Sequence, residues 1–486
     1  MRKHILLTAA LLLAALAAPA QNAFRGAYFM DTYLYGHTMN PALTANRSYA
    51  SLGLGHIDLQ TQSNMGTSTF FYPNGQNSVN FFLSESVPAE QFLGKLRKNN
   101  IENLNAQLDV LNFGFWTKKD QFHSFSLSAH VIESASVPYD LFRFLKTGSS
   151  DGHEYNLSGI GERARAYAQL AYGISFPVTD QLRIGGKVKA LVGLAYEDLR
   201  FDRIDVTLSG ERWNVETNGR MLASNLPAAQ SMVSLGLQDL FVFDDMDWSK
   251  FRPSGFGAAI DLGTTWDVLP WLQLSASVTD LGFIHWKMDM NRTTQGSWTY
   301  TGFDNISFEG NDDLQNQLDA KFNELNELLR FSPSSGGKAP SDFLPATFYL
   351  GAKAKPCDWF SAGLLGTARR EGQYSWAEMR AALNLEPTHW FGISGSAAYG
   401  TFGPKFSSLM NLRLGPFALF LAGELSSPYF VSSEPRAKHT IRDYVEGNVF
   451  ALPRDNYNLN LMIGLNLVFG RKVGVRVPVV EVEPLE

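Results

Sequence analysis

Candidate catalytic and ligand-binding residues are scattered along this chain. Residues 392–396 read GISGS, which resembles the turn around a nucleophilic serine, but the final glycine is missing and the stretch lies inside a strand-like segment. Residues 53–56 are rich in glycine, yet no helical pattern follows them, so they do not form a dinucleotide-binding loop. We therefore expect no catalytic residue, no cofactor and no enzymatic activity.

Candidate metal ligands show no metal-binding spacing. His123 and His130 fall on opposite faces of one predicted strand, so they cannot share an ion. Cys357 is the one cysteine of the chain, which rules out an internal disulfide and a cysteine zinc site. We expect it to be a small apolar residue in a strand.

Acidic residues gather in two predicted loops, around Asp244, Asp245 and Asp247 and at Asp312 and Asp313. Neither group matches the twelve-residue calcium loop, and solvated loop carboxylates explain both. The formal net charge of −6 is spread along the chain, and no basic run indicates a nucleic-acid partner. The sequence thus predicts no metal site and no nucleic-acid binding.

The first twenty residues are typical of an export signal. Arg2 and Lys3 precede the apolar run of residues 5–16, which is too short for a permanent membrane helix, and small residues end at Ala20. We expect residues 1–20 to be removed and the mature chain to begin at Gln21. The later residues contain no apolar run of about 18 residues, which a membrane-spanning helix would need.

Alternation with a period of two dominates the rest of the chain. In residues 163–176 the even positions carry Ala, Leu, Tyr, Ile or Phe, while the odd positions are mostly polar or small. The same pattern recurs in residues 182–194, 272–279 and 458–469. Successive strand residues point to opposite faces, so each run has one apolar and one polar face. Several runs reach the nine to eleven residues, roughly, that a tilted membrane strand needs.

Turns and aromatic residues favour a membrane barrel over a soluble sandwich. Short turns alternate with longer connections, as in outer-membrane barrels. The short turns are residues 116–122, 176–182, 267–272, 386–390 and 414–417, and the long connections are residues 87–105, 138–160, 218–253, 311–342 and 426–455. We expect an interfacial girdle formed by Trp116, Trp266, Trp271, Trp298, Trp359, Trp376 and Trp390.

These patterns predict an all-β transmembrane antiparallel barrel of about 14 strands over residues 48–470, with short helices in loops. Residues 88–107 and 312–330 have helical spacing and are interpreted as such loop helices. Residues 471–486 are expected to form a periplasmic C-terminal tail. A secreted soluble β protein is the least favoured alternative.

Three stretches resemble known families. MNPAL (residues 39–43) is similar to an element of the long-chain fatty-acid transporter superfamily, whose barrels carry an N-terminal hatch. SASVTDLGFIHWK (275–287) and NYNLNLMIGLNLVFG (456–470) resemble a Bacteroidota-type outer-membrane β-barrel family of unknown function. The resemblance implies a hatch or plug over residues 21–47. It also implies that Asn40, Pro41 and Ala42 lie near a ligand path, while a structural turn leading into the first strand is the alternative.

The expected location is the outer membrane, with its lipid as one partner. The resemblance implies binding or transport of a hydrophobic small molecule. The alternative is a non-transporting scaffold or accessory protein of a secretion or envelope complex, similar to type IX secretion, with periplasmic or secretion-system partners. An apolar pocket beside the hatch would favour transport, and a lumen filled with side chains would favour the scaffold.

Overall fold

The computed structural model describes residues 24–74, 79–148, 153–208, 213–224, 252–300, 331–334, 341–426, 430–432, 451–453 and 456–470. The predicted export signal, the predicted helix at 312–330, both acidic loop groups and the predicted tail at 471–486 lie outside these residues. No helix among the described residues is long and apolar enough to cross a membrane.

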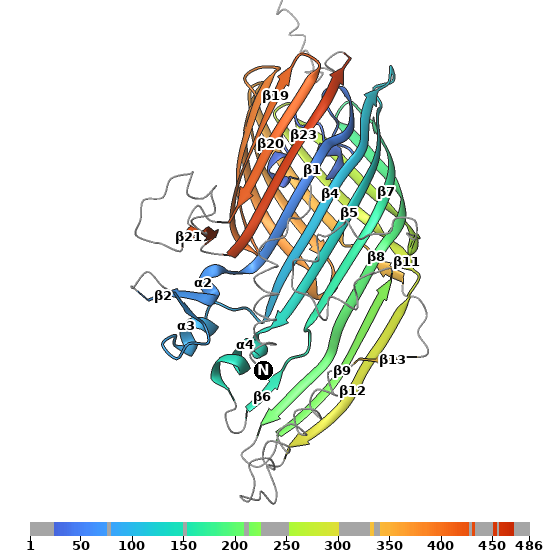
Figure 1. Cartoon of the computed structure of the whole chain (residues 1–486). Helices are drawn as coiled ribbons and strands as arrows, with labels where there is room; N and C mark the ends of the chain where they lie inside the picture. Colours follow the sequence, from blue (N-terminus) through green and yellow to red (C-terminus); the bar gives the residue numbers. More distant parts are fainter. Residues whose placement is uncertain are drawn as a thin grey trace, which may run out of the picture.

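Fourteen antiparallel strands close into a barrel, as the alternation predicts (Figure 1). Each strand pairs with the next, and β23 returns to pair with both β20 and β1. In order around the barrel they are β1 (Ser48–Gly66), β4 (Asn99–Trp116), β5 (Phe122–Pro138), β7 (Gly161–Pro177), β8 (Leu182–Leu208), β10 (Gly255–Leu269), β11 (Leu272–Trp286), β15 (Ala346–Cys357), β16 (Phe360–Arg370), β17 (Trp376–Leu385), β18 (Phe391–Gly400), β19 (Gly403–Leu414), β20 (Phe417–Leu425) and β23 (Asn456–Phe469).

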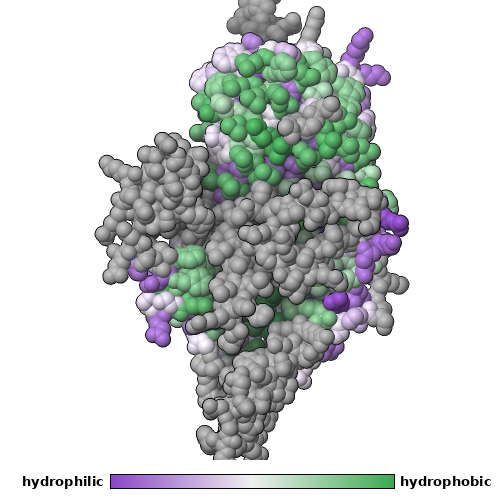
Figure 2. Space-filling view, in the orientation of Figure 1, coloured by the Kyte–Doolittle hydropathy of each residue, from purple (hydrophilic) through white to green (hydrophobic). Residues whose placement is uncertain are grey.

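The two faces of each strand separate as the alternation predicts. On β7, Leu170 and Tyr172 point outward and are 45% and 44% exposed, whereas Arg165 and Tyr167 point into the lumen and are buried. His123 and His130 of β5 likewise lie on opposite faces. Apolar side chains cover the outer wall of the barrel, and Figure 2 shows them on its upper part. Closing the sheet leaves no barrel strand with an unpaired edge, which is the requirement in lipid.

Tight turns gather at one rim of the barrel, at the top of Figure 1. Asp120 and Gly415 make two of these turns with positive φ angles of 57° and 62°. Four of the tryptophans predicted to form the girdle, Trp266, Trp271, Trp359 and Trp390, lie at this rim and are about half exposed.

The girdle prediction is wrong for three tryptophans. The Trp116 indole nitrogen donates a hydrogen bond to the Ala45 carbonyl, and Trp376 is buried in the lumen. Trp298 lies on β12 (Met290–Tyr300), a strand outside the barrel. Position near a strand end does not fix the face, and only the register decides which face a residue takes.

Opposite the tight turns, the sheet continues beyond the barrel. There β8 extends past its barrel neighbours and pairs with β6 (His153–Asn156) and with β9 (Trp213–Ser224), and β9 pairs with β12. The remaining short elements outside the N-terminal region are β13 (Ser332–Pro333), β14 (Ser341–Phe343), α2 (Thr67–Phe70), α3 (Ala89–Leu93), α4 (Tyr139–Thr147), the 3-10 turn η6 (Gly372–Tyr374), and the strand pairs β2–β3 (Phe71–Pro73, Val79–Phe81) and β21–β22 (Phe430–Ser432, Ala451–Pro453).

The helix predicted for residues 88–107 is wrong over most of its length. Only α3 is helical, and β4 begins at Asn99. Leu104 faces outward while Asn103 and Asn105 face the lumen, which is a strand pattern. Pairing of β4 with both β1 and β5 satisfies its backbone groups and overrides the local helical spacing.

Residues 24–47, here called the N-terminal segment, lie inside the barrel near the tight-turn rim (Figure 1). The segment contains two short 3-10 turns, η1 (Arg25–Ala27) and η2 (Gly36–Thr38), and no strand. Its aromatic residues form one core with inward-facing wall residues such as Phe122, Leu365 and Phe420. An irregular backbone is tolerated at this depth because protein surrounds it.

Candidate functional site

Glycines in the wall make room for the N-terminal segment. A Cβ atom at Gly363 of β16 would collide with the ring of Phe29, and one at Gly392 of β18 with the Met30 methyl group. On the other side of the barrel, Gly185 of β8 faces the Pro41 carbonyl in the same way. The wall therefore carries glycine where the segment approaches most closely.

The predicted site residues Asn40, Pro41 and Ala42 pack against β8 and β10. The Asn40 amide donates to the Tyr28 hydroxyl and to the Thr264 carbonyl, both at 3.1 Å, and its oxygen accepts from the Ala42 backbone N–H at 2.9 Å. Asn40 is fully buried. These contacts hold Asn40 rigidly against the wall. The prediction that residues 40–42 lie near a ligand path stays a prediction.

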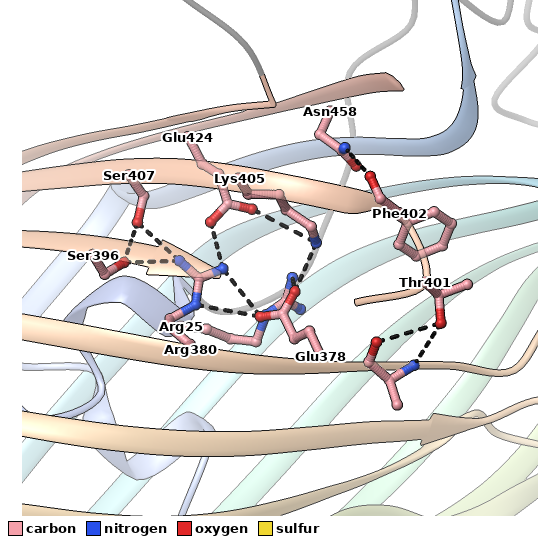
Figure 3. Close-up of polar contacts among 11 residues, drawn as sticks. Arg25, Glu378, Arg380, Ser396, Thr401, Phe402, Lys405, Ser407, Glu424 and Asn458 are labelled. Carbon is pink, nitrogen blue, oxygen red and sulfur yellow. Dashed lines mark hydrogen bonds and ion pairs between the residues drawn. The ribbon is translucent and has the colours of Figure 1, made fainter. Parts of the chain in front are cut away.

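Arg25 binds the wall at the inner end of the segment (Figure 3). Its Nε lies 2.7 Å from Oε1 of Glu378, whose other oxygen lies 2.7 Å from Lys405 Nζ. Arg380 bridges Glu378 at 3.0 Å and Glu424 at 2.6 Å. All five side chains are at most 3% exposed, so each charge depends on its partners for compensation. We call this group the inner ion cluster.

Asp31 binds the wall near the tight-turn rim. Its two carboxylate oxygens pair with Lys353 and, at 2.6 Å, with Lys355. Glu386 accepts the backbone N–H groups of Asp31 at 3.1 Å and of Thr32 at 2.7 Å. Burial alone would raise the pKa of the Asp31 carboxyl, but the two lysines outweigh it and hold that pKa below its ordinary value.

A chain of hydrogen bonds joins the segment to three wall strands. Lys187 Nζ donates to the His37 carbonyl at 3.2 Å and lies 3.4 Å from His37 Nδ1. The Tyr49 hydroxyl donates to Asn112 at 2.9 Å, so it accepts from His37 Nε2 at 2.5 Å. Burial and then Lys187 lower the pKa of His37, which stays neutral with its proton on Nε2.

A cavity of about 70 Å³ adjoins this chain in the lumen. Its lining is strongly polar and includes Asp109, His130, Lys187, Asp280 and Arg369. Such a volume holds a few water molecules or a small polar group. It does not offer the apolar lining that a hydrophobic ligand would require.

Sequence reasoning missed the inner ion cluster and the cavity. The signal was present in part, since Glu378 and Arg380 occupy inward positions two residues apart on β17. Their partners come from β19, β20 and the N-terminal segment, so the pairing is visible only after the barrel closes. Among the described residues, no group of three or more His, Cys, Asp or Glu could hold a metal ion.

Comparison with known proteins adds a family and distant structural likenesses. Residues 41–423 match the sequence model described as a family of unknown function, DUF5723. No curated protein matches the sequence.

Among solved structures, the Ralstonia pickettii toluene transporter TbuX is 10% identical (TM-score 0.38, covering 90% of this chain and 95% of that one). A Pseudomonas aeruginosa FadL homologue is 11% identical (TM-score 0.40, covering 93% and 99%). The P. putida toluene transporter TodX is 8% identical (TM-score 0.37, covering 89% and 93%). These likenesses are too distant to indicate a cargo.

Proposed function

This chain belongs to the DUF5723 family, and from that premise we propose that it is an outer-membrane barrel that binds or passes a small molecule, closed here by its N-terminal segment. In this proposal the tight turns face the periplasm and the extended strands face outward, as in other outer-membrane barrels. The segment acts as a plug that must move before a solute can cross.

Membrane insertion is supported by the outward-facing side chains. Leu350, Leu364, Leu383 and Leu465 are 69%, 57%, 57% and 52% exposed on four different barrel strands. A soluble protein rarely leaves so many large apolar side chains in water, because each costs free energy that burial would recover. A hydrocarbon layer removes that cost. A soluble secreted β protein would instead carry a polar outer belt.

The seating of the N-terminal segment is the observation that carries the proposal. About eight strands suffice to anchor a barrel, whose interior the wall side chains can then fill. This barrel has fourteen strands and fills its wider lumen with a separate stretch of chain. The side-chain contacts of Arg25 and Asp31 can be exchanged for contacts with water, whereas the wall is held by a continuous ladder of backbone hydrogen bonds.

The nature of the cargo is the finer part of the proposal. A hydrophobic ligand has the family resemblance as its support. The polar cavity lining of Asp109, Lys187 and Arg369 instead favours a water-soluble molecule. We favour a water-soluble molecule, because its support comes from residues of this chain.

Reconstitution tests the proposal. The full-length protein is inserted into liposomes and planar bilayers beside a variant lacking residues 24–45. We expect the intact protein to be closed and the truncated one to conduct potassium chloride. A truncated barrel that inserts, shown by heat-modifiable migration, and yet stays closed would refute the plug.

The second candidate is the scaffold, favoured by the filled lumen and by the structure beyond the barrel. The extensions of β8, β9 and β12 build a sheet with its own apolar core, which includes Tyr155 and Phe201. Transport does not require such a platform, whereas docking of an envelope protein would use it. Stoichiometric co-purification of one protein with the intact chain, lost on deletion of residues 201–222, would favour this candidate.

A further inference from the structure

Six amide side chains cover one part of the inner wall, on the neighbouring strands β23, β1 and β4. They stand in two rows set by the strand register: Asn460, Gln60 and Asn105 form one row, and Asn458, Gln62 and Asn103 the other. All six point into the lumen and are at most 2% exposed. We call this surface the amide wall.

The amide wall leaves hydrogen-bonding groups unused. Among the described residues, the amide oxygens of Gln60, Asn103, Asn105, Asn458 and Asn460 have no hydrogen-bond partner, and neither do the amide nitrogens of Asn103 and Asn105. Nearly all buried polar groups in folded proteins are paired. Such a concentration of unpaired donors and acceptors on one surface indicates a ligand that supplies both.

From this surface we infer that the barrel binds a neutral, polyhydroxylated molecule such as an oligosaccharide, recognised by the amide wall. The inference rests on the proposed function and names its cargo class. A hydroxyl group both donates and accepts, as an amide does, so a row of hydroxyls can pair with a row of amides. An apolar molecule would leave the amides unpaired, and sites built to hydrogen-bond reject such analogues strongly.

The borders of the amide wall limit the ligand further. The six amides themselves carry no charge, so they can pair with hydroxyl groups but cannot compensate the charge of an ionic solute. Asp58 flanks the wall on β1, and neither of its carboxylate oxygens has a hydrogen-bond partner among the described residues. It can accept hydrogen bonds from hydroxyl groups of the same ligand. Gln107, the next inward residue of β4 after Asn105, lines the polar cavity, so the wall and the cavity adjoin.

The N-terminal segment controls access to this surface. With its amide oriented to face donors, Gln62 accepts from Arg25 at 3.1 Å and from Lys405. Arg25 thus contacts both the other members of the inner ion cluster and Gln62 at one edge of the amide wall. Withdrawal of the segment removes Arg25 from Gln62 and opens the wall to a solute in the lumen.

Equilibrium dialysis of the full-length protein in detergent tests the inference, with labelled maltotetraose, laurate and acetyl-trialanine amide as probes. The background is Arg25→Ala, which removes the contact of the N-terminal segment with Gln62. The test variant adds Asn103→Leu and Asn105→Leu, which remove unpaired polar atoms at similar volume and so preserve the fold. The control adds Asn384→Leu, a buried lumenal amide on β17 that pairs with Ser361.

We expect maltotetraose to bind the Arg25→Ala protein and its Asn384→Leu control, and the double leucine variant to bind it at least about 10-fold more weakly, since about two hydrogen bonds are lost. Equal binding by the double leucine variant, or binding of laurate or the peptide in place of maltotetraose, would overturn the inference. Potassium chloride conductance of the same proteins is measured in parallel. Conductance without saccharide binding would refute only the assignment of an oligosaccharide as the cargo. Saccharide binding without conductance would refute only the proposal that the N-terminal segment is a movable plug.

Discussion

Arg25 and Glu378 stand 353 residues apart in sequence, yet their side chains meet at 2.7 Å in the buried lumen. The contact joins the first described turn of the chain to strand β17 on the far part of the barrel wall. It ties the position of the N-terminal segment to a charge cluster that only the closed barrel assembles. Figure 3 shows how the neighbouring Arg380 and Lys405 converge on the same carboxylate.

Replacing Arg25 should loosen the N-terminal segment. We expect Arg25→Ala to weaken its seating by about 3 kcal/mol, the lower end for breaking a buried ion pair, because Glu378 keeps Lys405 and Arg380. Single-channel recording in planar bilayers should then show frequent openings. Arg47→Ala is the matched control, because Arg47 makes an exposed hydrogen bond to the Gly470 carbonyl. Equal opening frequencies for the two variants would contradict the role of Arg25.

Adding a methyl group at a wall glycine should displace the N-terminal segment without removing a charge. Gly363→Ala places a methyl group against the Phe29 ring, and we expect a cost of about 1–3 kcal/mol. Hydrogen exchange of residues 24–47 should accelerate. Gly395→Ala, where the new methyl group meets open space, should leave the exchange unchanged. If hydrogen exchange of residues 24–47 were unaltered in Gly363→Ala, the close contact between Gly363 and Phe29 would not be needed to hold the segment.

Protonation of Asp31 should release the N-terminal segment only at low pH. Its pKa is lowered when the segment is seated, so its contribution is complete above the ordinary carboxyl value of about 3.9 and is lost as the pH falls through the lowered pKa. We expect conductance to stay constant from pH 7 to pH 5. Asp31→Asn should raise conductance at pH 7, because the pairs with Lys353 and Lys355 are lost. A wild-type opening centred between pH 5 and pH 7 would exclude this assignment.

Asn40 should act as an anchor rather than as part of a ligand path. Asn40→Ala removes the bonds to Tyr28 and Thr264, and we expect local destabilisation of about 1–2 kcal/mol. Hydrogen exchange in residues 36–45 should therefore rise while ligand affinity in an opened background stays constant. Thr32→Ala is the control, since its hydroxyl has no partner among the described residues. A selective loss of affinity would restore the ligand-path prediction.

The outer wall should reject charge. Leu364 is 57% exposed on β16, and we expect Leu364→Arg to destabilise the barrel in lipid by about 2–4 kcal/mol if it lies near the midplane. Thr207→Arg, on the exposed extension of β8, should change stability by less than about 0.5 kcal/mol. Unfolding in urea from phosphatidylcholine vesicles measures both. If Leu364→Arg left the free energy of unfolding unchanged, the outward face of β16 would lie outside the membrane.

Part of the fold could be predicted from local patterns. Strand β7 reads as alternating apolar and polar residues, and Leu170 does face outward while Arg165 faces the lumen. The resemblance also implied a hatch before the first strand, and residues 24–47 do lie inside the barrel without forming a strand. Predictions near the ends of strands were wrong. Residues 99–107 form a strand where a helix was predicted, and Trp376 is buried where an exposed girdle residue was predicted.

Local sequence patterns were enough to predict the architecture, because the period of two and the spacing of short turns are properties of each strand and its own turns. They could not determine which side chains meet in the lumen. Arg25 meets Glu378, and Gln60 stands between Asn460 and Asn105, only because closure and register bring distant strands together. A shift of one residue in any strand would turn those side chains toward lipid, so the tertiary structure alone decided the lumenal chemistry.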